Sequence, residues 1–510
     1  MNEYGESLIM HRDRSKQITT IESYGIEEIP AHARTATPFD LFRLSFGGAN
    51  TFSTCVLGSF PIVFGLSFQA GFWAILCGVL LGGCILAPMG IFGARTGTNN
   101  AVASAAHFGV HGRIVGSFLS LLTAIAFFSL SVWSSGDALI GATERLFASS
   151  YQSNWLYGLV YCGFALLVLI ICIYGFRFML LVNRIAVIAS SLLFFLGMFA
   201  FSTQFDSSYA GQLQLGQTGF WAAFMGAALI AFSNPVSFGT FLGGWSRYIP
   251  KETASHKIMA AVFVSQLATL IPFLFGLMTA SIVANSVPTF MQQNNYIGGL
   301  IQIAPAWYFI PLCLIALIGG LSTGTTALYG TGLDLSSLFP KSLTRVKATI
   351  WVGLLSILFI FIGRFAANLT QSVMTFATLI VVCTSPWIII MIIGFITRKG
   401  YYKNDDLQVF ANGLKGGAYW FHHGWNWRGI IAWIPSAVIG LCFVHLPDQF
   451  IGIWGHLFNG LDLSLPISIF LAALLYSSLL KLFPEPSIVY RAAPTAEKLK
   501  LKCSTSFISE

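Results

Sequence analysis

Long apolar segments separated by short polar ones run along most of the chain. The pattern leaves twelve apolar segments, most of them near or above the roughly 20 residues that a helix needs to cross a bilayer. Each is predicted to be a transmembrane helix, because backbone polar groups in lipid must be paired within their own segment. The twelve predicted spans are residues 41–66, 71–94, 114–141, 155–176, 180–202, 218–246, 258–285, 305–333, 347–364, 370–396, 428–447 and 464–483.

Two predicted spans contain residues that interrupt helices. The first holds a Gly-Gly-Ala-Asn-Thr run at 47–51, and the sixth holds Ser-Asn-Pro at 233–235 followed by glycines at 239, 243 and 244. Backbone released from a helix at membrane depth is tolerated only where it is buried in protein or lines a cavity. Interruptions at corresponding places in two halves are typical of inverted-repeat secondary transporters. The alternative is that Gly and Pro are simply common in membrane helices.

The interruptions divide the chain into two halves offset by about 180–190 residues. We expect a cytoplasmic N-terminal tail (1–40), a first five-helix repeat (41–202), a second five-helix repeat (218–396), a cytoplasmic loop (397–427), two additional helices (428–483) and a cytoplasmic tail (484–510). The fold class is therefore all-α integral membrane, with a five-plus-five inverted-repeat core and two C-terminal helices. No cleaved signal peptide is expected, since no apolar core follows the polar opening segment.

Positive charge predicts the orientation of the spans. With the N-terminus inside, only Arg145 and Arg364 of the 27 Lys and Arg residues fall in outer segments. Cytoplasmic segments carry an excess of Lys and Arg, so both termini are predicted to be cytoplasmic. An odd number of spans would break the alternation.

Composition supports the membrane class. The chain is 55% hydrophobic and 9% charged, against about 25% charged in soluble domains, and its mean hydropathy is +0.75. The net charge of +8 therefore does not indicate nucleic-acid binding. The nine cysteines are scattered, with no metal-ligand spacing, and are interpreted as small core residues.

The third span contains a single acid, Asp137. A carboxylate inside a membrane helix costs roughly 2.5–3.5 kcal/mol on insertion scales, so it normally faces protein or a water-filled cavity. Trp133 lies four residues earlier, on the same helical face. An aromatic ring beside a carboxylate suits a flat, polar, nitrogen-bearing molecule. The alternative is that Asp137 reaches the lipid headgroups, with Trp133 as an interfacial anchor.

The eighth span concentrates hydroxyl side chains. Ser322, Thr323, Thr325 and Thr326 lie within five positions, beside a GxxxG pair that allows close helix packing. Such hydroxyls could complete an oxygen shell for Na⁺ together with carbonyls freed in the first span. Alternatively, they bond back to their own helix. The spacing does not decide between the two.

No sequence motif indicates an enzyme. The chain has no Walker loop, no HExxH and no GxSxG, and the spans hold no second acid, metal set or nucleophile to accompany Asp137. Transport would therefore be driven by an ion gradient. A signalling receptor would need a longer soluble tail than the final 27 residues.

Four stretches carry a family resemblance. They are residues 26–51 (IEEIPAHARTATPFDLFRLSFGGANT), 93–112 (GARTGTNNAVASAAHFGVHG), 243–250 (GGWSRYIP) and 419–433 (YWFHHGWNWRGIIAW). All four resemble blocks of the nucleobase:cation symporter-1 family, the purine, cytosine, allantoin and thiamine permeases. The second is similar to the cytosine-permease version.

The resemblance implies a planar heterocycle held between aromatic residues of the third and sixth spans. Its substrate-binding positions fall on Trp133, Asp137, Ser237, Phe238 and Asn50, with Thr325 as a further candidate on the eighth span. The family's sodium ligands would map to carbonyls near Phe46, Ala49 and Gly319 and to the hydroxyls of Ser322 and Thr323.

Three departures from the family pattern bear on the substrate. An acid, Asp137, replaces the usual amide, Phe238 replaces a tryptophan, and the stretch 322–328 holds no asparagine. A carboxylate favours a ring rich in N–H groups or a cationic ring. Fungal relatives use protons, and Asp137 could itself carry the proton.

The sequence is therefore interpreted as a secondary active transporter that imports a cytosine- or purine-like heterocycle with Na⁺ or H⁺. The alternative is a vitamin permease for thiamine, hydroxymethylpyrimidine or a pyridoxine-type substrate. We expect a monomer in the cell membrane, with no catalytic residue, no nucleic-acid partner and no cofactor beyond a possible coupling Na⁺.

Overall fold

Helices make up nearly all the regular structure of the chain. The structure, a computed structural model, describes residues 27–147, 154–174, 176–293, 295–339, 342–366, 369–410, 414–446 and 450–490. Within these ranges the strands form one short antiparallel ribbon, β1 (His445–Leu446) with β2 (Phe450–Ile451).

The first half of the chain contains the predicted spans one to five. Span one is a pair of short helices, span two is a helix with a bend, and spans three to five are single long helices. The bounds are η1 (Ala31–Ala33), α2 (Pro38–Ala49), α3 (Phe52–Val63), α4 (Phe68–Leu86), α5 (Met89–Thr96), α6 (Asn100–Ala103), α7 (Ala105–Phe108), α8 (Ile114–Phe147), α9 (Asn154–Tyr174) and α10 (Phe176–Phe201).

In the second half the order of elements is similar, with a broken helix followed by long helices. Two further helices come after them. The bounds are α11 (Phe220–Ser237), α12 (Leu242–Ser246), α13 (Ser255–Ala268), α14 (Leu270–Ser286), α15 (Pro288–Gln292), α16 (Tyr296–Ile303), α17 (Phe309–Leu338), α18 (Arg345–Ala366), α19 (Leu369–Thr397), α20 (Asn404–Leu407), α21 (Trp427–Cys442), η2 (Leu457–Gly460), α22 (Ser464–Leu482) and η3 (Ser487–Val489).

The helical, multi-pass architecture is confirmed. Among the described residues, nine helical segments are long and apolar enough to cross a membrane, and α3 and α21 are shorter apolar helices. Each of the twelve predicted segments overlaps one helix or a consecutive pair. The number of spans and the boundaries of the two repeats stay predictions.

The first interruption lies where the sequence predicts it. Thr37 begins α2 with a capping box, in which its hydroxyl accepts from the backbone N–H of Asp40 and the Asp40 carboxylate accepts from the N–H of Thr37. The helix ends at Ala49, and Asn50 leaves helical geometry. Thr51 then caps α3 by accepting from the N–H of Thr54. Two polar residues therefore separate the half-helices.

The second interruption lies one turn later than the Ser-Asn-Pro triplet. The α11 helix continues through Pro235 to Ser237, and the chain leaves regular helix over 238–241 before α12 begins at Leu242. Proline removes one hydrogen bond to the preceding turn, which weakens the helix without ending it at that residue. The break is therefore centred on Gly239 and not on Pro235.

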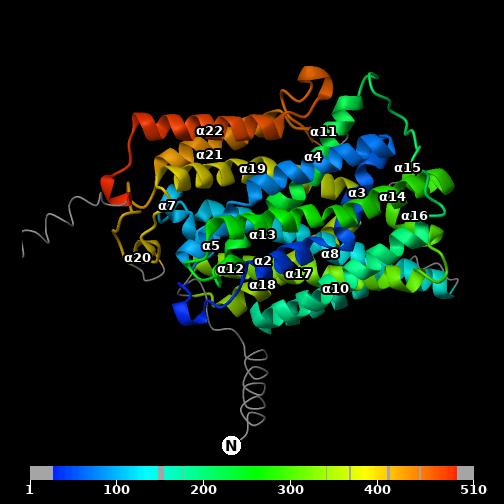
Figure 1. The fold of residues 1–510 in the computed structure, drawn as a ribbon, viewed down its shortest axis with the longest axis horizontal. Coiled ribbons are helices and arrows are strands. Elements are labelled where there is room, and N and C mark those ends of the chain that lie inside the picture. Colours follow the sequence, from blue (N-terminus) through cyan, green and yellow to red (C-terminus); the bar gives the residue numbers. More distant parts are fainter. Residues whose placement is uncertain are drawn as a thin grey trace, which may run out of the picture.

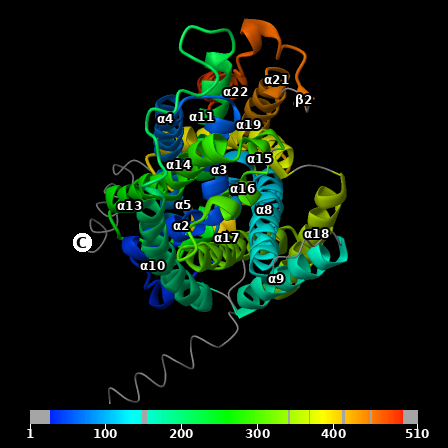
Figure 2. The ribbon, with the colours of Figure 1, turned by 90° about the vertical axis from the view of Figure 1, so that its right-hand side faces the viewer.

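The interrupted first span lies inside the bundle. Figures 1 and 2 show α2 and α3 among longer helices, with α21 and α22 on one side of the bundle and α9 and α18 on another. Close approach of α3 to α14 depends on two glycines. A Cβ at Gly58 would lie 2.1 Å from the carbonyl oxygen of Phe273, and one at Gly276 would lie 1.9 Å from that of Cys55.

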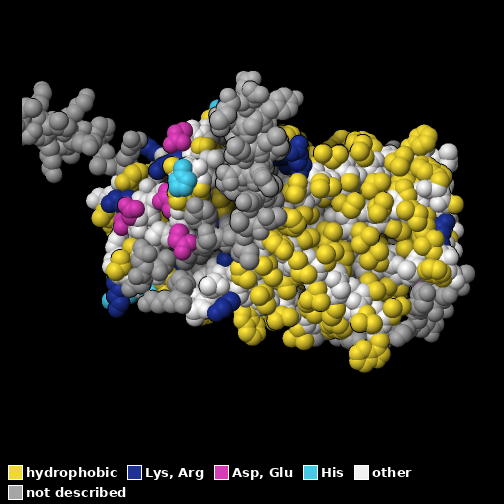
Figure 3. Space-filling view, turned by 90° about the horizontal axis from the view of Figure 1, so that it is seen from below, with side chains coloured by type: hydrophobic (Ala, Val, Ile, Leu, Met, Phe, Trp, Pro, Cys, Tyr) yellow, Lys and Arg dark blue, Asp and Glu magenta, His cyan; other side chains and the backbone are white. Residues whose placement is uncertain are grey.

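The outer surface matches a lipid-facing protein. Hydrophobic side chains cover most of the face in Figure 3, whereas charged side chains gather at the end where α7 and α20 lie in Figure 1. Large apolar residues such as Trp155 (85% exposed) and Phe199 (73%) point outward. Contiguous apolar surface of this kind marks a membrane or protein contact.

Candidate functional site

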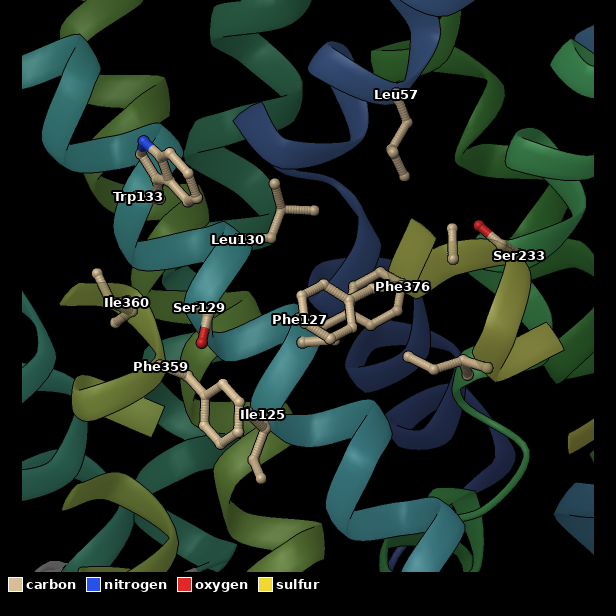
Figure 4. A pocket seen from close by; sticks show the side chains of 13 residues that line it. Leu57, Ile125, Phe127, Ser129, Leu130, Trp133, Ser233, Phe359, Ile360 and Phe376 are labelled. Atoms are coloured by element: carbon tan, nitrogen blue, oxygen red, sulfur yellow. The ribbon is translucent and has the colours of Figure 1, made fainter. Parts of the chain in front are cut away.

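A cavity lies beside Trp133, between α8 and the helices that face it (Figure 4). The cavity volume is about 50 Å³, and the cavity opens in part to the exterior. Side chains of α3, α8, α11, α18 and α19 line it. They are Leu57, Ile125, Ala126, Phe127, Ser129, Leu130, Trp133, Ser233, Phe359, Ile360, Phe376, Ala377 and Ile380.

The cavity wall is largely apolar and aromatic. Its side-chain polar groups are the hydroxyls of Ser129 and Ser233 and the indole N–H of Trp133. Trp133 is 5% exposed, so the protein fixes its ring. Phe359 and Phe376, each about 40% exposed, stand at the wall formed by α18 and α19. Apolar walls with a few polar groups are typical of small-molecule sites, and a flat ring could stack on Trp133.

Asp137 lies next to this cavity on α8 but does not line it. Its carboxylate accepts a hydrogen bond from the hydroxyl of Tyr161 on α9. Tyr161 is 1% exposed and packs in the same apolar cluster as Trp133. The acid therefore faces protein, as the cost of a carboxylate in lipid requires.

Phe238 and Ser237 lie at the break after α11, away from the cavity. The Phe238 ring contacts Phe241 and Trp245 at centroid distances of 5.5 and 5.7 Å. A Cβ at Gly48 would lie 3.2 Å from the Phe238 ring. Ser237 donates its hydroxyl to the Asn234 carbonyl at 2.6 Å. The residue of α11 that does line the cavity is Ser233, one turn earlier.

The break in the first span brings together polar groups from three helices. Asn50 donates its amide to the Ser191 hydroxyl on α10 at 2.9 Å. Asn183, also on α10, donates to the Ser322 hydroxyl at 3.0 Å. Among the described residues the side-chain oxygens of Asn50 and Asn183 have no hydrogen-bond partner although both are buried. Buried amide oxygens are ligands suited to a hard cation.

Two of the α17 hydroxyls cross to the first span. Ser322 donates to the Gly47 carbonyl at 2.7 Å, and Thr323 donates to the Gly48 carbonyl at 2.8 Å. Thr325 and Thr326 instead donate to carbonyls of their own helix. Bonding back to their own helix therefore holds for Thr325 and Thr326, whereas Na⁺ binding by Ser322 and Thr323 stays a prediction.

The other cation candidates lie around the same break. The Phe46 carbonyl accepts from the Asn50 N–H at 2.6 Å, and the Ala49 carbonyl accepts from the Thr51 N–H at 3.0 Å. Gly319 lies against the first span, since a Cβ there would stand 2.9 Å from the Thr51 Cα. The structure therefore brings Phe46, Ala49, Gly319, Ser322 and Thr323 into one neighbourhood.

Three contacts near the site were not anticipated from the sequence. Tyr161 donates to Asp137, Asn183 donates to the Ser322 hydroxyl on α17, and the Ser53 hydroxyl lies 3.0 Å from that of Ser134 on α8. Asn183 carries a signal that could have been used, because it is an amide inside an apolar span. The sequence offers no such signal for Tyr161 or Ser53, because Tyr and Ser are ordinary residues in membrane helices.

Comparison with known protein families finds one match across most of the chain. Residues 28–467 match the family model described as permease for cytosine/purines, uracil, thiamine and allantoin. A Bacillus subtilis protein named as a purine-cytosine permease, YxlA, is 25% identical over 90% of this chain and 96% of its own length. The vitamin B6 transporter TPN1 of Saccharomyces cerevisiae is 23% identical over 68% of this chain and 60% of its own length.

Solved structures share the fold. Mhp1, a nucleobase-cation-symport-1 family transporter, was solved in a closed conformation with bromovinylhydantoin bound and matches with a TM-score of 0.70. The match covers 92% of this chain and 98% of Mhp1 at 18% identity. A Na⁺-coupled sialic acid symporter matches with a TM-score of 0.59 at 11% identity, over 92% of this chain and 94% of its own.

Proposed function

The chain belongs to the family of permeases for cytosine/purines, uracil, thiamine and allantoin, and on that premise we propose that it imports a planar nitrogen heterocycle by cation symport. The substrate is a cytosine- or purine-like nucleobase, and the coupling ion is Na⁺ or H⁺. Transport proceeds by alternating access, in which the two ends of the bundle open in turn.

The observation that carries this proposal is the cavity beside Trp133. It lies between α8, α11, α18 and α19, next to the interrupted helices, where transporters of this architecture hold their substrates. Its aromatic, weakly polar wall suits stacking of a flat ring, with Ser129 and Ser233 as hydrogen-bonding groups. Asn50, Asp137, Ser237, Phe238 and Thr325 are proposed to complete the site as the helices rearrange around bound substrate.

The coupling ion is proposed to bind at the break in the first span. The hydroxyls of Ser322 and Thr323 already point to this break, and the side-chain oxygens of Asn50 and Asn183 are buried beside it. Oxygen ligands from a broken helix and a facing helix suit Na⁺. The carbonyls of Phe46, Ala49 and Gly319 would join the ligand set when their present contacts are released.

A vitamin permease is the second candidate function. The similarity to the vitamin B6 transporter TPN1 extends over 68% of this chain and favours it. A pyridoxine-type or thiamine-type ring is also planar and nitrogen-bearing, so the same cavity would serve. In either case we propose a monomer in the cell membrane with both termini cytoplasmic, as the distribution of Lys and Arg predicts.

Uptake measurements on reconstituted protein test the proposal. Labelled cytosine, adenine, hypoxanthine, uracil, thiamine and pyridoxine would be presented in turn to proteoliposomes under an imposed Na⁺ gradient, an imposed pH gradient or neither. We expect one compound to accumulate, and only with one gradient. Accumulation of thiamine or pyridoxine alone would favour the vitamin candidate, and failure of every ring compound would reject both.

A further inference from the structure

A buried cluster of charged residues lies at the Arg-rich end of the bundle, far from the cavity. Asp334 on α17 and Arg247 after α12 are 0% exposed, and Arg113, which precedes α8, is 1% exposed. The charges of both arginines act on the Asp334 carboxylate. Neither the substrate site nor the cation site proposed above uses any of these three residues.

The cluster joins segments that are distant in the sequence. Asn99, in the connection between α5 and α6, donates its side-chain amide to Asp334. Arg247 donates to the hydroxyls of Tyr248 and Tyr329 at 3.2 and 3.4 Å. The Arg113 guanidinium lies 4.3 Å from the centre of the Phe410 ring. Ser120 of α8 also faces the carboxylate.

The segment that follows Asn99 extends the contact to the second interruption. Asn100 donates its amide to the Gly239 carbonyl at 2.7 Å, inside the break between α11 and α12. Further along the same segment, Val110, between α7 and α8, donates its N–H to the carbonyl of Tyr419 in the α19–α21 connection at 3.2 Å. The cluster therefore ties α17, α8 and the second broken helix to one connecting segment.

Burying three charges is costly unless the charges compensate one another and their donors and acceptors are satisfied. Here one acid stands against two cations contributed by different elements. Loss of the acid would leave two buried guanidiniums without the carboxylate whose charge compensates them. The packing of this end should therefore depend on Asp334 more than on either arginine.

We propose that Asp334 is a positioning residue that holds this end of the transporter closed through Arg113, Arg247 and Asn99. Opening toward the side where Lys and Arg gather separates α17 and α8, which stay packed together, from α12 and hydrates the three charges. Closing rebuilds the cluster. This inference rests on the proposed function only in its use of alternating access, and it makes no assumption about the substrate.

Hydrogen–deuterium exchange on the purified full-length protein tests the proposal without knowledge of the substrate. Asp334→Asn keeps the size of the side chain and an acceptor for Asn99 but removes the charge. We expect backbone amides of residues 97–113 to exchange at least about tenfold faster in this variant. Amides of α16, at the opposite end, should become more protected, because the two ends open in turn.

A matched variant and a rescue separate this role from general destabilisation. Asp462→Asn changes another buried acid, 6% exposed and placed beyond the opposite end of α21, and should leave exchange over 97–113 unchanged. Adding Arg247→Gln to Asp334→Asn removes one uncompensated cation. The exchange rate over residues 97–113 should then fall part of the way back to that of the unchanged protein.

Two results would overturn the proposal. One is unchanged exchange over 97–113 in Asp334→Asn, and the other is faster exchange at both ends of the molecule, which is the signature of loosened packing. Uptake assays test the proposed function separately. Protein that moves no ring compound but shows the expected exchange pattern would reject the proposed substrate and support the role of Asp334.

Discussion

The hydroxyl of Tyr161 on α9 donates a hydrogen bond to the carboxylate of Asp137 on α8. The acid that stands out in the sequence is thus compensated by a neighbouring helix and not by lipid headgroups. It lies one turn from Trp133, which lines the cavity. Two roles follow for Asp137, as a direct substrate contact or as a proton carrier, and variants distinguish them.

Asp137→Asn is expected to weaken substrate binding by roughly 1–3 kcal/mol, the value of a charge-assisted hydrogen bond. The loss should be larger for a ring that carries an amine than for its deaminated analogue, such as cytosine against uracil. Competition binding with both ligands measures the difference.

Tyr161→Phe is the companion variant for Asp137. It removes the bond to Asp137 but keeps the charge, so binding should be retained or slightly tighter. If Asp137 carries the proton instead, Asp137→Asn should abolish uphill accumulation while exchange of bound substrate continues. Small and equal losses for every ligand, with accumulation intact, would assign Asp137 a purely structural role.

Trp133→Ala should lower substrate affinity about five- to hundredfold, because stacking of a base on an aromatic ring is worth roughly 1–3 kcal/mol. Trp73→Ala is the matched control, since Trp73 is 57% exposed on α4 and lies outside the cavity. Equilibrium binding to purified protein measures both. Normal affinity in a well-folded Trp133→Ala protein would place the substrate elsewhere.

Phe238 allows a test of whether the site rearranges. The ring now packs with Phe241 and Trp245, away from the cavity. If substrate draws the second break toward α8, Phe238→Ala should cost a similar five- to hundredfold in affinity and Phe238→Trp should tighten binding. Unchanged affinity in Phe238→Ala would restrict the aromatic contact to Trp133 and the walls of α18 and α19.

Removing the hydroxyls of Ser322 and Thr323 should weaken Na⁺ stimulation of uptake, because both hydroxyls point to the break in the first span. Each loss is expected to raise the Na⁺ concentration for half-maximal uptake by about five- to tenfold, at about 1 kcal/mol for one oxygen contact. Thr326→Ala serves as control, since the Thr326 hydroxyl bonds to carbonyls of its own helix. Uptake that does not depend on the Na⁺ concentration and is abolished by a proton uncoupler would identify H⁺ as the coupling ion.

His107 should make the thermal stability depend on pH. Burial, and then the charge of Arg398, hold the pKa of His107 well below its usual value of about 6.5. Below pH 6.5 the unfolded chain therefore binds a proton that the folded protein does not, and stability falls as the pH falls.

Thermal melts of the detergent-solubilised protein between pH 5 and 8 measure this effect. The loss should approach about 1.4 kcal/mol per pH unit below 6.5. His107→Gln should flatten the slope, whereas His423→Gln, which changes an exposed histidine, should not. A slope retained in full by His107→Gln would assign the pH dependence to other groups.

Several features of this protein followed from the sequence alone. Apolar segments of sufficient length must form helices in lipid, so their positions and the membrane class could be predicted from hydropathy. Polar and helix-breaking residues located the first interruption within residues 47–51, because caps and breaks are local chemistry, and the structure places it at Asn50 and Thr51. The family resemblance was also readable from local motifs, and the match over residues 28–467 confirmed it.

Partners across the bundle were decided only by the tertiary structure. The sequence does not indicate that Tyr161 contacts Asp137, that Asn183 contacts Ser322, or that the charges of Arg113 and Arg247 act on Asp334. The hydroxyls of α17 illustrate the reason. Four similar side chains within five positions divide into two that cross to another helix and two that do not, according to how α17 is rotated against α2. That rotation is set by packing over the whole bundle, which no local pattern encodes.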